Sequence, residues 1–400
     1  MTFSKNSPLP FFPLFLLVFI FYLNFVSRII MAPLLPIIET ELGLGHGQAG
    51  SFFFFVAFGY AFGLLGSGLI SFLLTHRLTI TLAGMMGGLT LILISRSTSI
   101  AGIYAGQVII GIFAGFYLPS GIATITENIS REHWGKAMSI HELAPSLAFI
   151  STPLLSEFLL NFFSWRGALT ALGVWAILMP VLFLMFGRGS RKKGEPPHLA
   201  LMRKILTDPS CWVMATFFMV SIGASYGIYT MLPLYLVSEI RMDRQWANTL
   251  IGLSRTFGGV VLLCYGFFID RMGPKRAMTF FLVATGLSTF LLGFAHGSGS
   301  LTIPALVFLQ AASVVCLFPV GFTIVSLLFP DRHRGVAVSL VIFVGFFLGG
   351  GIIPTAIGYW AEAFSFSSGF ALLGLFFLAL LPFFLRNRTR LKISEYTAVK

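Results

Sequence analysis

The chain has 400 residues, of which 56% are hydrophobic and only 10% are charged, and its formal net charge is +12. Soluble proteins carry about 25% charged residues, so this composition excludes an ordinary soluble domain. Apolar runs of about 20 residues recur along the chain, and each is long enough to cross a bilayer as a helix. The sequence therefore predicts a polytopic helical membrane protein.

We predict twelve membrane spans. Their approximate limits are 11–38, 48–74, 78–95, 100–126, 137–163, 166–187, 211–238, 246–269, 277–296, 301–329, 336–363 and 366–385. The first run has no small-residue cleavage site after a short core, so we interpret it as a retained span and not a signal peptide. Cys211, Cys264 and Cys316 lie in apolar runs without C-x-x-C spacing, which predicts buried thiols and no disulfide or metal site.

One long polar segment, 188–210, separates two blocks of six spans. We interpret it as a cytoplasmic linker with a short surface helix near Ala200–Leu206. The expected organisation is an N-terminal six-helix domain (1–187), the linker, a C-terminal six-helix domain (211–385) and a tail (386–400).

The basic residues set the predicted orientation. Twenty of the 26 Lys and Arg residues lie on the side of the linker and the termini, so the positive-inside rule predicts that both termini are cytoplasmic. The positive charge is thus a topology signal, and nucleic acid is not an expected partner. The expected location is the plasma membrane, which in a bacterium is the inner membrane.

The two blocks share an approximate internal repeat. At an offset of 200 the matching pairs are Pro119 and Pro319, Gly121 and Gly321, Gly135 and Gly335, Ala137 and Ala337, and Ser139 and Ser339. Two repeated halves with a site between them near the midplane are typical of secondary transporters. The predicted fold class is all-α, with twelve transmembrane helices in two pseudo-repeated six-helix bundles.

Residues 266–276 join two spans through a short charged hairpin, GFFIDRMGPKR, in which Gly273 and Pro274 favour a sharp turn. The segment matches G-x-x-x-D-[RK]-x-G-x-[RK]-[RK], and in this it resembles the loop signature of the major facilitator superfamily. The resemblance implies the major facilitator fold and a cytoplasmic gate formed by Gly266, Asp270, Arg271, Gly273, Lys275 and Arg276. The equivalent loop of the first half has Phe72 where the second half has Asp270, so no matching latch is expected there.

Arg28 lies within the first predicted span, with Asn24 one turn earlier on the same face. Pro36, eight residues later, removes a backbone hydrogen bond and is expected to loosen the helix. A guanidinium group can bind a carboxylate or phosphate through two parallel hydrogen bonds. Arg28 and Asn24 are therefore predicted to bind an anionic substrate. The alternative is an internal ion pair between Arg28 and Glu142.

An Arg eight residues before a Pro in the first span is similar to the organophosphate:phosphate antiporter branch, in which that Arg binds the substrate phosphate. The seventh span resembles the same branch around Tyr226 and Pro233. The second arginine of that branch is replaced here by Ser225, and its fifth-span histidine by Pro145. These departures favour a smaller or singly charged anion over a sugar phosphate.

His141 and Glu142 are adjacent titratable residues in the fifth predicted span. Buried titratable groups resist charging unless they are paired, and histidine changes protonation in the physiological range. We predict that this pair handles a coupling proton, with Arg255 of the eighth span favouring ionisation of Glu142. The alternative is a purely structural ion pair of Glu142 with Arg255 or Arg28.

Gln107 and Gln310 lie in the fourth and tenth predicted spans, where a side-chain amide either contacts substrate or hydrogen-bonds between helices. Both are kept as substrate-binding candidates beside the packing alternative. Tyr226 and Tyr229 are candidates for lining the same cavity, and the alternative for both is again packing.

The sequence thus predicts a proton-coupled secondary transporter for a small organic anion, working by alternating access as a single chain in the lipid bilayer. Efflux of hydrophobic or drug-like compounds is the alternative, and a transporter-like membrane sensor is an alternative of another class. No cluster of nucleophile, base and orienting group and no metal-ligand spacing is present, so neither an enzyme nor a metal or cofactor is expected.

Overall fold

The computed structural model describes residues 11–187, 189–190, 192–194, 199–295 and 301–387. In these residues every regular element is a helix. Contacts group the chain into two compact units: Met1–Leu34 with Phe55–Pro197, and Leu35–Phe54 with His198–Lys400.

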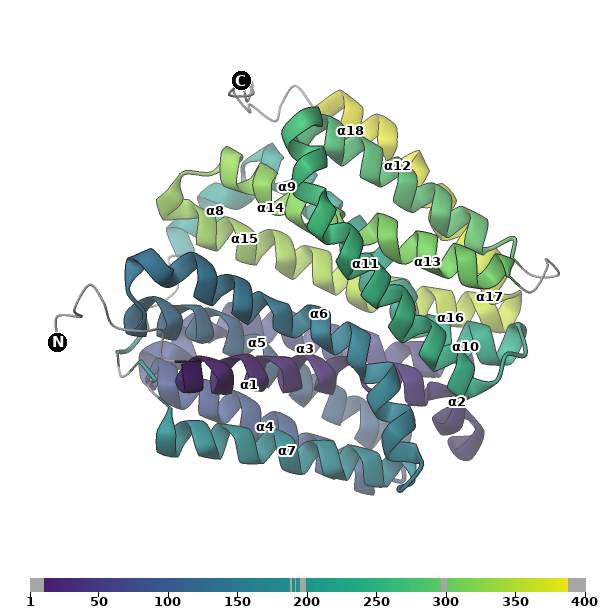
Figure 1. The fold of residues 1–400 in the computed structure, drawn as a ribbon, viewed down its shortest axis with the longest axis horizontal. Helices are drawn as coiled ribbons and strands as arrows, with labels where there is room; N and C mark the ends of the chain where they lie inside the picture. Colours follow the sequence, from purple (N-terminus) through teal and green to yellow (C-terminus); the bar gives the residue numbers. More distant parts are fainter. Residues whose placement is uncertain (1–10, 188, 191, 195–198, 296–300, 388–400) are drawn as a thin grey trace. The chain divides into compact units, whose positions relative to one another are not determined.

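The first unit is built from the helices of the N-terminal half (Figure 1). They are α1 (Phe11–Ile29), α3 (His46–Leu73), α4 (His76–Arg96), α5 (Ile100–Asn128), η1 (Arg131–His133), α6 (Trp134–Leu160) and α7 (Trp165–Phe186). The beginning of α3 belongs to the second unit. Within the first unit α1 packs along α6, and α4 packs between α5 and α7.

The second unit contains most of α2 and the helices of the C-terminal half. They are α2 (Met31–Leu42), α8 (Leu199–Leu206), α9 (Pro209–Ile222), η2 (Gly223–Gly227), α10 (Ile228–Leu234), η3 (Tyr235–Glu239), α11 (Arg244–Met272), α12 (Pro274–Leu292), α13 (Thr302–Val315), α14 (Leu317–Leu328), α15 (Asp331–Gly345), η4 (Phe346–Ile352), α16 (Ile353–Ala363), α17 (Phe366–Ala379) and α18 (Leu381–Asn387). Helix α8 confirms the short helix predicted in the linker.

The described residues contain 12 helical segments that are long and apolar enough to cross a membrane, as the sequence predicts. Six precede the linker and six follow it. Large apolar side chains such as Phe62, Leu93, Trp175 and Leu375 are exposed. Exposed side chains of this kind suit a lipid solvent, since only water penalises them.

The packing inside each unit repeats, which confirms the pseudo-repeated bundles. In the first unit α1 packs on α6 and α4 packs on α7; in the second unit α9 packs on α15 and α12 packs on α17. These pairs join the first span to the fifth and the third to the sixth of each half. The same helices therefore meet in both halves, as a duplicated six-helix plan requires.

Glycines allow α3 and α5 to approach until their backbones touch. A Cβ atom added to Gly111 would lie 2.2 Å from the Val56 carbonyl oxygen and 2.6 Å from the Tyr60 nitrogen. Gly59 faces the Val108 carbonyl oxygen in the same way, at 2.1 Å. Small residues at such crossings gain close van der Waals contact, which drives helix association inside a bilayer.

Several spans are interrupted in their interior. The first span breaks at Ile30, earlier than the loosening expected at Pro36, which lies inside α2. Pro33 explains the position, because its ring crowds the carbonyl group of Ile29 and it has no N–H to donate there. The seventh span contains the π-helices η2 and η3, and the eleventh contains η4. π-Helical turns are frequent at functional sites, and these were not predicted from the sequence.

The predicted sharp turn between the eighth and ninth spans is present. Helix α11 ends at Met272 and α12 begins at Pro274, so Gly273 alone connects them, with a φ of +73°. Glycine adopts this left-handed conformation without steric cost, and proline is well suited to the first turn of a helix. One expectation is wrong: Cys264 is exposed, whereas Cys211 and Cys316 are buried.

Candidate substrate and proton sites

Arg28 lies near the end of α1, inside the first unit, and is only 1% exposed. The guanidinium carbon is 3.9 Å from the ring centroid of Phe25 and 4.5 Å from that of Tyr60. The Nε atom donates to the Asn24 carbonyl oxygen at 3.4 Å. Two aromatic faces offset part of the cost of burying this cation and hold its plane in a defined position.

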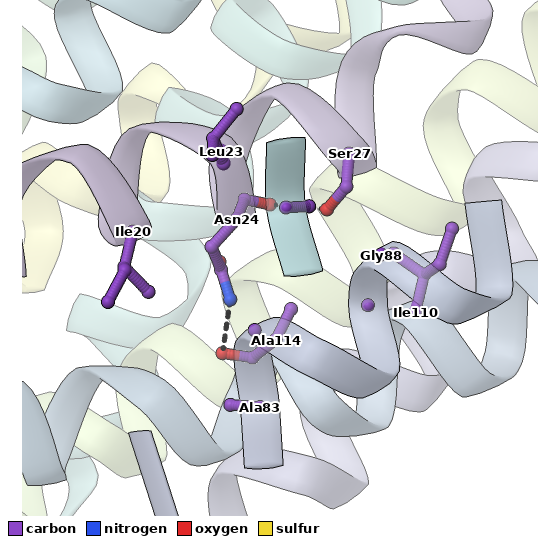
Figure 2. A pocket seen from close by; sticks show the side chains of 11 residues that line it. Ile20, Leu23, Asn24, Ser27, Ala83, Gly88, Ile110 and Ala114 are labelled. Carbon is purple, nitrogen blue, oxygen red and sulfur yellow. Dashed lines mark hydrogen bonds between the residues drawn. The ribbon is translucent and has the colours of Figure 1, made fainter. Parts of the chain in front are cut away.

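Asn24 lies one turn before Arg28, as expected, and its side chain lines a small cavity within the first unit (Figure 2). The amide nitrogen donates to the carbonyl oxygen of Ala114 on α5 at 3.4 Å. Ser27 lines the same cavity, and its hydroxyl donates to the Asn24 carbonyl oxygen at 2.8 Å.

The two glutamines, for which the sequence allows the same two roles, have different surroundings. In the second unit Gln310 donates from Nε2 to the Ala224 carbonyl oxygen at 2.8 Å, which joins α13 to η2. In the first unit Gln107 is 1% exposed, and neither Oε1 nor Nε2 has a hydrogen-bond partner among the described residues. An unmatched buried polar atom costs about 1–3 kcal/mol. The burial of Gln107, unlike that of Gln310, is therefore not explained by its contacts with the described residues.

Helix geometry relates Gln107 to Arg28. Asn24 contacts Ala114, which sets the level at which α1 meets α5. Gln107 lies seven residues before Ala114, which is nearly two full turns and therefore the same face of α5. Tyr60, whose ring lies on the Arg28 guanidinium, belongs to the stretch of α3 that crosses α5 at Gly111. Arg28, Tyr60 and Gln107 thus belong to one region of the first unit.

His141 and Glu142 form the predicted pair, with 3.1 Å between Nδ1 and Oε1. The His141 side chain is fully buried, and its ring stacks on Phe21 at 4.4 Å, whereas the Glu142 side chain is 56% exposed. The pair therefore extends from the protein interior to an accessible surface. Tyr117 joins it, with its hydroxyl oxygen 3.1 Å from His141 Nε2.

The hydrogen bonds fix the position of the protons on His141. The Tyr117 hydroxyl donates its single hydrogen to the Leu17 carbonyl oxygen at 2.7 Å, so Nε2 of His141 must be the donor to Tyr117. Nδ1 of His141 then faces Oε1 of Glu142. Either a protonated Nδ1 donates to the carboxylate or a carboxylic acid donates to a bare Nδ1. In both forms one proton lies between Nδ1 and Oε1.

In the second unit the candidates gather around η2. Arg255 donates from Nη2 to the Ser225 carbonyl oxygen at 3.2 Å, and its guanidinium carbon is 5.1 Å from the Tyr229 ring centroid. A π-helical turn changes the pairing of the helical backbone, which leaves carbonyl groups available to side chains. Tyr226 is buried, with its ring 5.0 Å from Phe346. The π-turn, Arg255, Gln310 and both tyrosines thus form one region of this unit.

A match to a family model decides the identity of the fold and its general function. The model described as Major Facilitator Superfamily matches residues 14–264 and 245–398, which is nearly the whole chain. The chain belongs to the Major Facilitator Superfamily. It is therefore a secondary transporter of the membrane and not an enzyme.

Relatives in this superfamily are distant in sequence. The inner membrane transport protein YnfM of Escherichia coli (strain K12) is 25% identical over 151 residues, which cover 38% of this chain and 36% of that protein. The 4-hydroxybenzoate transporter PcaK of Pseudomonas aeruginosa is 22% identical over 379 residues, covering 85% of this chain and 83% of that one. In structure, a bacterial homologue of the human lysosomal transporter Spinster superposes with a TM-score of 0.82 at 15% identity, covering 96% of this chain and 99% of that chain.

The hairpin between α11 and α12 carries the loop signature of the superfamily. Arg271 and Arg276 are exposed, and Lys275 is half-buried beside the Gly273 turn. The side chains of residues 265–270 lie outside the described part of the chain, so the gate roles of Gly266 and Asp270 stay predictions. Glu142 and Arg255 belong to different units, and their predicted pairing likewise stays a prediction.

Some residues of these regions were not predicted from the sequence. Phe25 had a signal, since it lies three residues before Arg28 on the same helical face. Tyr60 and Tyr117 had none, because a tyrosine in an apolar run is more often a packing residue. A further hollow of about 440 Å³ in the second unit, lined by His46 and Glu239 among others, was also missed. Its parts come from distant segments, with Glu239 capping the first backbone amides of α17.

No group of three or more His, Cys, Asp or Glu side chains within the described ranges is arranged to hold a metal ion.

Proposed function

We propose that this transporter moves a small organic carboxylate together with protons, and that Arg28 binds the carboxylate. The observation that carries the proposal is the buried guanidinium between the Phe25 and Tyr60 rings. Ionised side chains within a span are costly and usually serve an ion or substrate pathway. A guanidinium group binds a carboxylate through two parallel hydrogen bonds, which makes Arg28 the proposed contact for the substrate carboxylate.

The relatives support a carboxylate substrate. The Pseudomonas relative that aligns over most of this chain carries 4-hydroxybenzoate, an aromatic acid. The rings of Phe25 and Tyr60 beside Arg28 are a suitable surface for a flat conjugated substrate. An aromatic or conjugated monocarboxylate is therefore the proposed substrate class.

Gln107 is the proposed second contact. It is fully buried, it lies on the face of α5 that α1 meets, and both polar atoms of its amide lack a partner within the described residues. A substrate polar group beyond the carboxylate would satisfy that amide. Gln310, which already donates to the Ala224 carbonyl oxygen, is proposed to hold the π-turn in place.

The coupling proton is proposed to use the gap between His141 Nδ1 and Glu142 Oε1. The exposed carboxylate exchanges a proton with water, and the buried imidazole receives it without changing its bond to Tyr117. Phe21 and Tyr117, stacked on the ring, keep its orientation constant during the exchange.

The proposed topology has both termini and the linker on the cytoplasmic side, with a single chain as the working unit. The distribution of Lys and Arg supports the orientation. A reporter fused after Lys400, active only in the cytoplasm or only outside it, tests this directly.

The main experiment uses purified protein in liposomes with 4-hydroxybenzoate as the probe and 4-hydroxybenzyl alcohol as its uncharged counterpart. Removing a charge-assisted pair costs about 1.5–3 kcal/mol, so Arg28→Gln should lower counterflow of the acid about 10- to 100-fold. Arg96→Gln, which changes an exposed arginine, is the matched control and should transport normally. Equal transport of acid and alcohol, or normal transport by Arg28→Gln, would contradict the carboxylate proposal.

A second measurement separates proton coupling from substrate binding. His141→Gln should keep counterflow of the probe but lose accumulation driven by a pH gradient. His133→Gln, which changes a half-buried histidine of η1, is the control and should accumulate the probe normally. Unchanged pH-driven accumulation by His141→Gln would contradict the role of the pair while leaving the substrate proposal intact.

A further inference from the structure

The hairpin that joins α2 to α3 (residues 35–54) packs on α16 within the second unit. A Cβ atom added to Gly358 would lie 2.3 Å from the His46 carbonyl oxygen, and one added to Gly50 would lie 2.7 Å from the Pro354 carbonyl oxygen. The Thr355 hydroxyl oxygen lies 3.2 Å from the Gly50 carbonyl oxygen. The hairpin comes from the N-terminal half of the chain and α16 from the C-terminal half. Since alternating access moves one repeat against the other, these contacts must break when the halves part at this end.

His46 lies at the start of α3, between carboxylates on neighbouring elements. Its Nδ1 atom donates to the Glu39 carboxylate of α2, at 3.0 Å from both oxygens. Because an ionised carboxylate only accepts, the Nδ1 hydrogen stays in place and a further proton is taken up at Nε2. The Glu362 carboxylate of α16 lies over the residue before His46, since a Cβ atom added to Gly45 would overlap Glu362 Oε1.

Two further charged groups line the hollow of about 440 Å³ that His46 also lines. Glu239 of η3 accepts from the Phe366 amide at 2.6 Å, and the Phe366 ring is 4.8 Å from the imidazole. Arg241 follows η3, and α17 contributes no charged side chain. The three carboxylates outnumber this one guanidinium, so the surroundings favour a cation at His46. The His46 side chain is 28% exposed, which gives water access to it.

We propose that His46 is a proton-binding site that controls the α2–α3 hairpin: the protonated imidazole, attracted by Glu362 and Glu239, holds the hairpin on α16. Glu39 belongs to the same hairpin and stays beside His46 when the hairpin moves, so it does not couple the proton to docking. Glu362 and Glu239 lie on the other side of the contact, and docking brings them near. Because docking strengthens proton binding, proton binding strengthens docking to the same degree. This site is separate from the proposed coupling pair of the first unit and does not depend on the substrate.

The direction of the pH dependence follows from these charges. Histidine changes protonation between about pH 5 and 8, and carboxylates stay ionised above about pH 5. Lowering the pH through this range adds the attraction of the imidazolium group to Glu362 and Glu239 and favours the docked hairpin. Partly exposed ion pairs are weak, so the ratio of docked to undocked hairpin should rise only about two- to fivefold.

The test is double electron–electron resonance on the full chain in nanodiscs without substrate. Nitroxide labels are attached through Thr40→Cys on α2 and Ala363→Cys on α16, both exposed positions, with the exposed Cys264 removed as Cys264→Ser. The population at the shorter, docked distance should rise about two- to fivefold relative to the longer one between about pH 8 and pH 5.5. His46→Gln retains hydrogen bonding but takes up no proton in this range, and should lose the pH dependence.

Two further variants keep the test valid if His46→Gln does not fold. Glu362→Gln keeps the size of an exposed side chain, removes the carboxylate of α16 and should reduce the pH dependence. His133→Gln changes a histidine of η1 that lies 3.6 Å from Glu132, and should keep the full pH dependence. Equal distance distributions at both pH values, or a docked population that falls in acid, would overturn the proposal. Retained pH dependence in His46→Gln or an unchanged one in Glu362→Gln would overturn it as well, and would leave the counterflow results for the substrate untouched.

Discussion

Replacement of Gly111 by alanine tests the close crossing of α3 and α5. The added Cβ would lie 2.2 Å from the Val56 carbonyl oxygen, 2.6 Å from the Tyr60 nitrogen and 2.9 Å from the Gly59 carbonyl carbon. All three are backbone atoms of a helix, so no side-chain rotation relieves the overlap. The two helices must separate by more than an ångström to restore ordinary van der Waals contact.

The cost follows from two opposing effects. Forcing extra volume into a well-packed region costs about 1–3 kcal/mol. Alanine regains up to about 1 kcal/mol over glycine within a helix. We therefore expect Gly111→Ala to destabilise the fold by about 1–2 kcal/mol. Because the crossing also positions Tyr60 on the Arg28 guanidinium, transport of 4-hydroxybenzoate should fall in the same variant.

Gly66→Ala provides the matched control on α3. A Cβ atom at Gly66 would meet only the Cε1 atom of Phe116, at an ordinary 3.5 Å. This variant should gain about 0.5–1 kcal/mol from helix propensity, so the two substitutions have opposite expected signs. The assay is thermal unfolding in detergent followed by tryptophan fluorescence. A Gly111→Ala protein that melts at or above the unaltered chain would refute the backbone-contact argument.

Three further changes have defined outcomes. Glu239→Gln keeps the size of the cap on α17 but removes its charge, and should lower stability by about 0.3–1 kcal/mol, measured as a fall in melting temperature that shrinks in high salt. Ser164→Ala removes the side chain that accepts from the Gly167 amide at the start of α7, and should cost about 1 kcal/mol; an unchanged melting temperature would show that another group caps the helix. Gln310→Met leaves the Ala224 carbonyl oxygen without its donor and should cost about 1–3 kcal/mol, while the KM for the probe stays unchanged if the residue only supports the π-turn.

Much of the fold could be read from the sequence because bilayer physics is local. Each span needs about 20 apolar residues whatever its neighbours are, so the twelve spans and their all-helical class followed from run lengths alone. The sharp turn at Gly273 also followed, because it depends on the backbone freedom of glycine and on the proline beside it. The site candidates could be identified for a similar reason. Charged and amide side chains are rare within spans, so Arg28, His141 and Gln107 are functional candidates.

The interruptions of the spans were less predictable. Pro36 was expected to loosen the first span, but that span breaks at Ile30, ahead of Pro33. The π-turn η2 has glycines at both ends, and nothing in its composition distinguishes it from an ordinary helical stretch of a packed span. Such turns are stabilised by partners on other helices, here Gln310 and Arg255.

Residue type and run length in the sequence determined the membrane class, the number of spans and the few polar groups able to carry out transport chemistry. Only the tertiary structure decided how those groups are used. It distinguished Gln310, which is hydrogen-bonded, from Gln107, whose amide has no partner within the described residues. It placed Phe25 and Tyr60 on the Arg28 guanidinium. It also showed that the Tyr117 hydroxyl donates to the Leu17 carbonyl oxygen and that His141 Nδ1 faces Glu142. The physical reason is that a hydrogen bond or a ring contact depends on distances of a few ångströms between separate helices, and apolar spans of similar composition leave those distances undetermined.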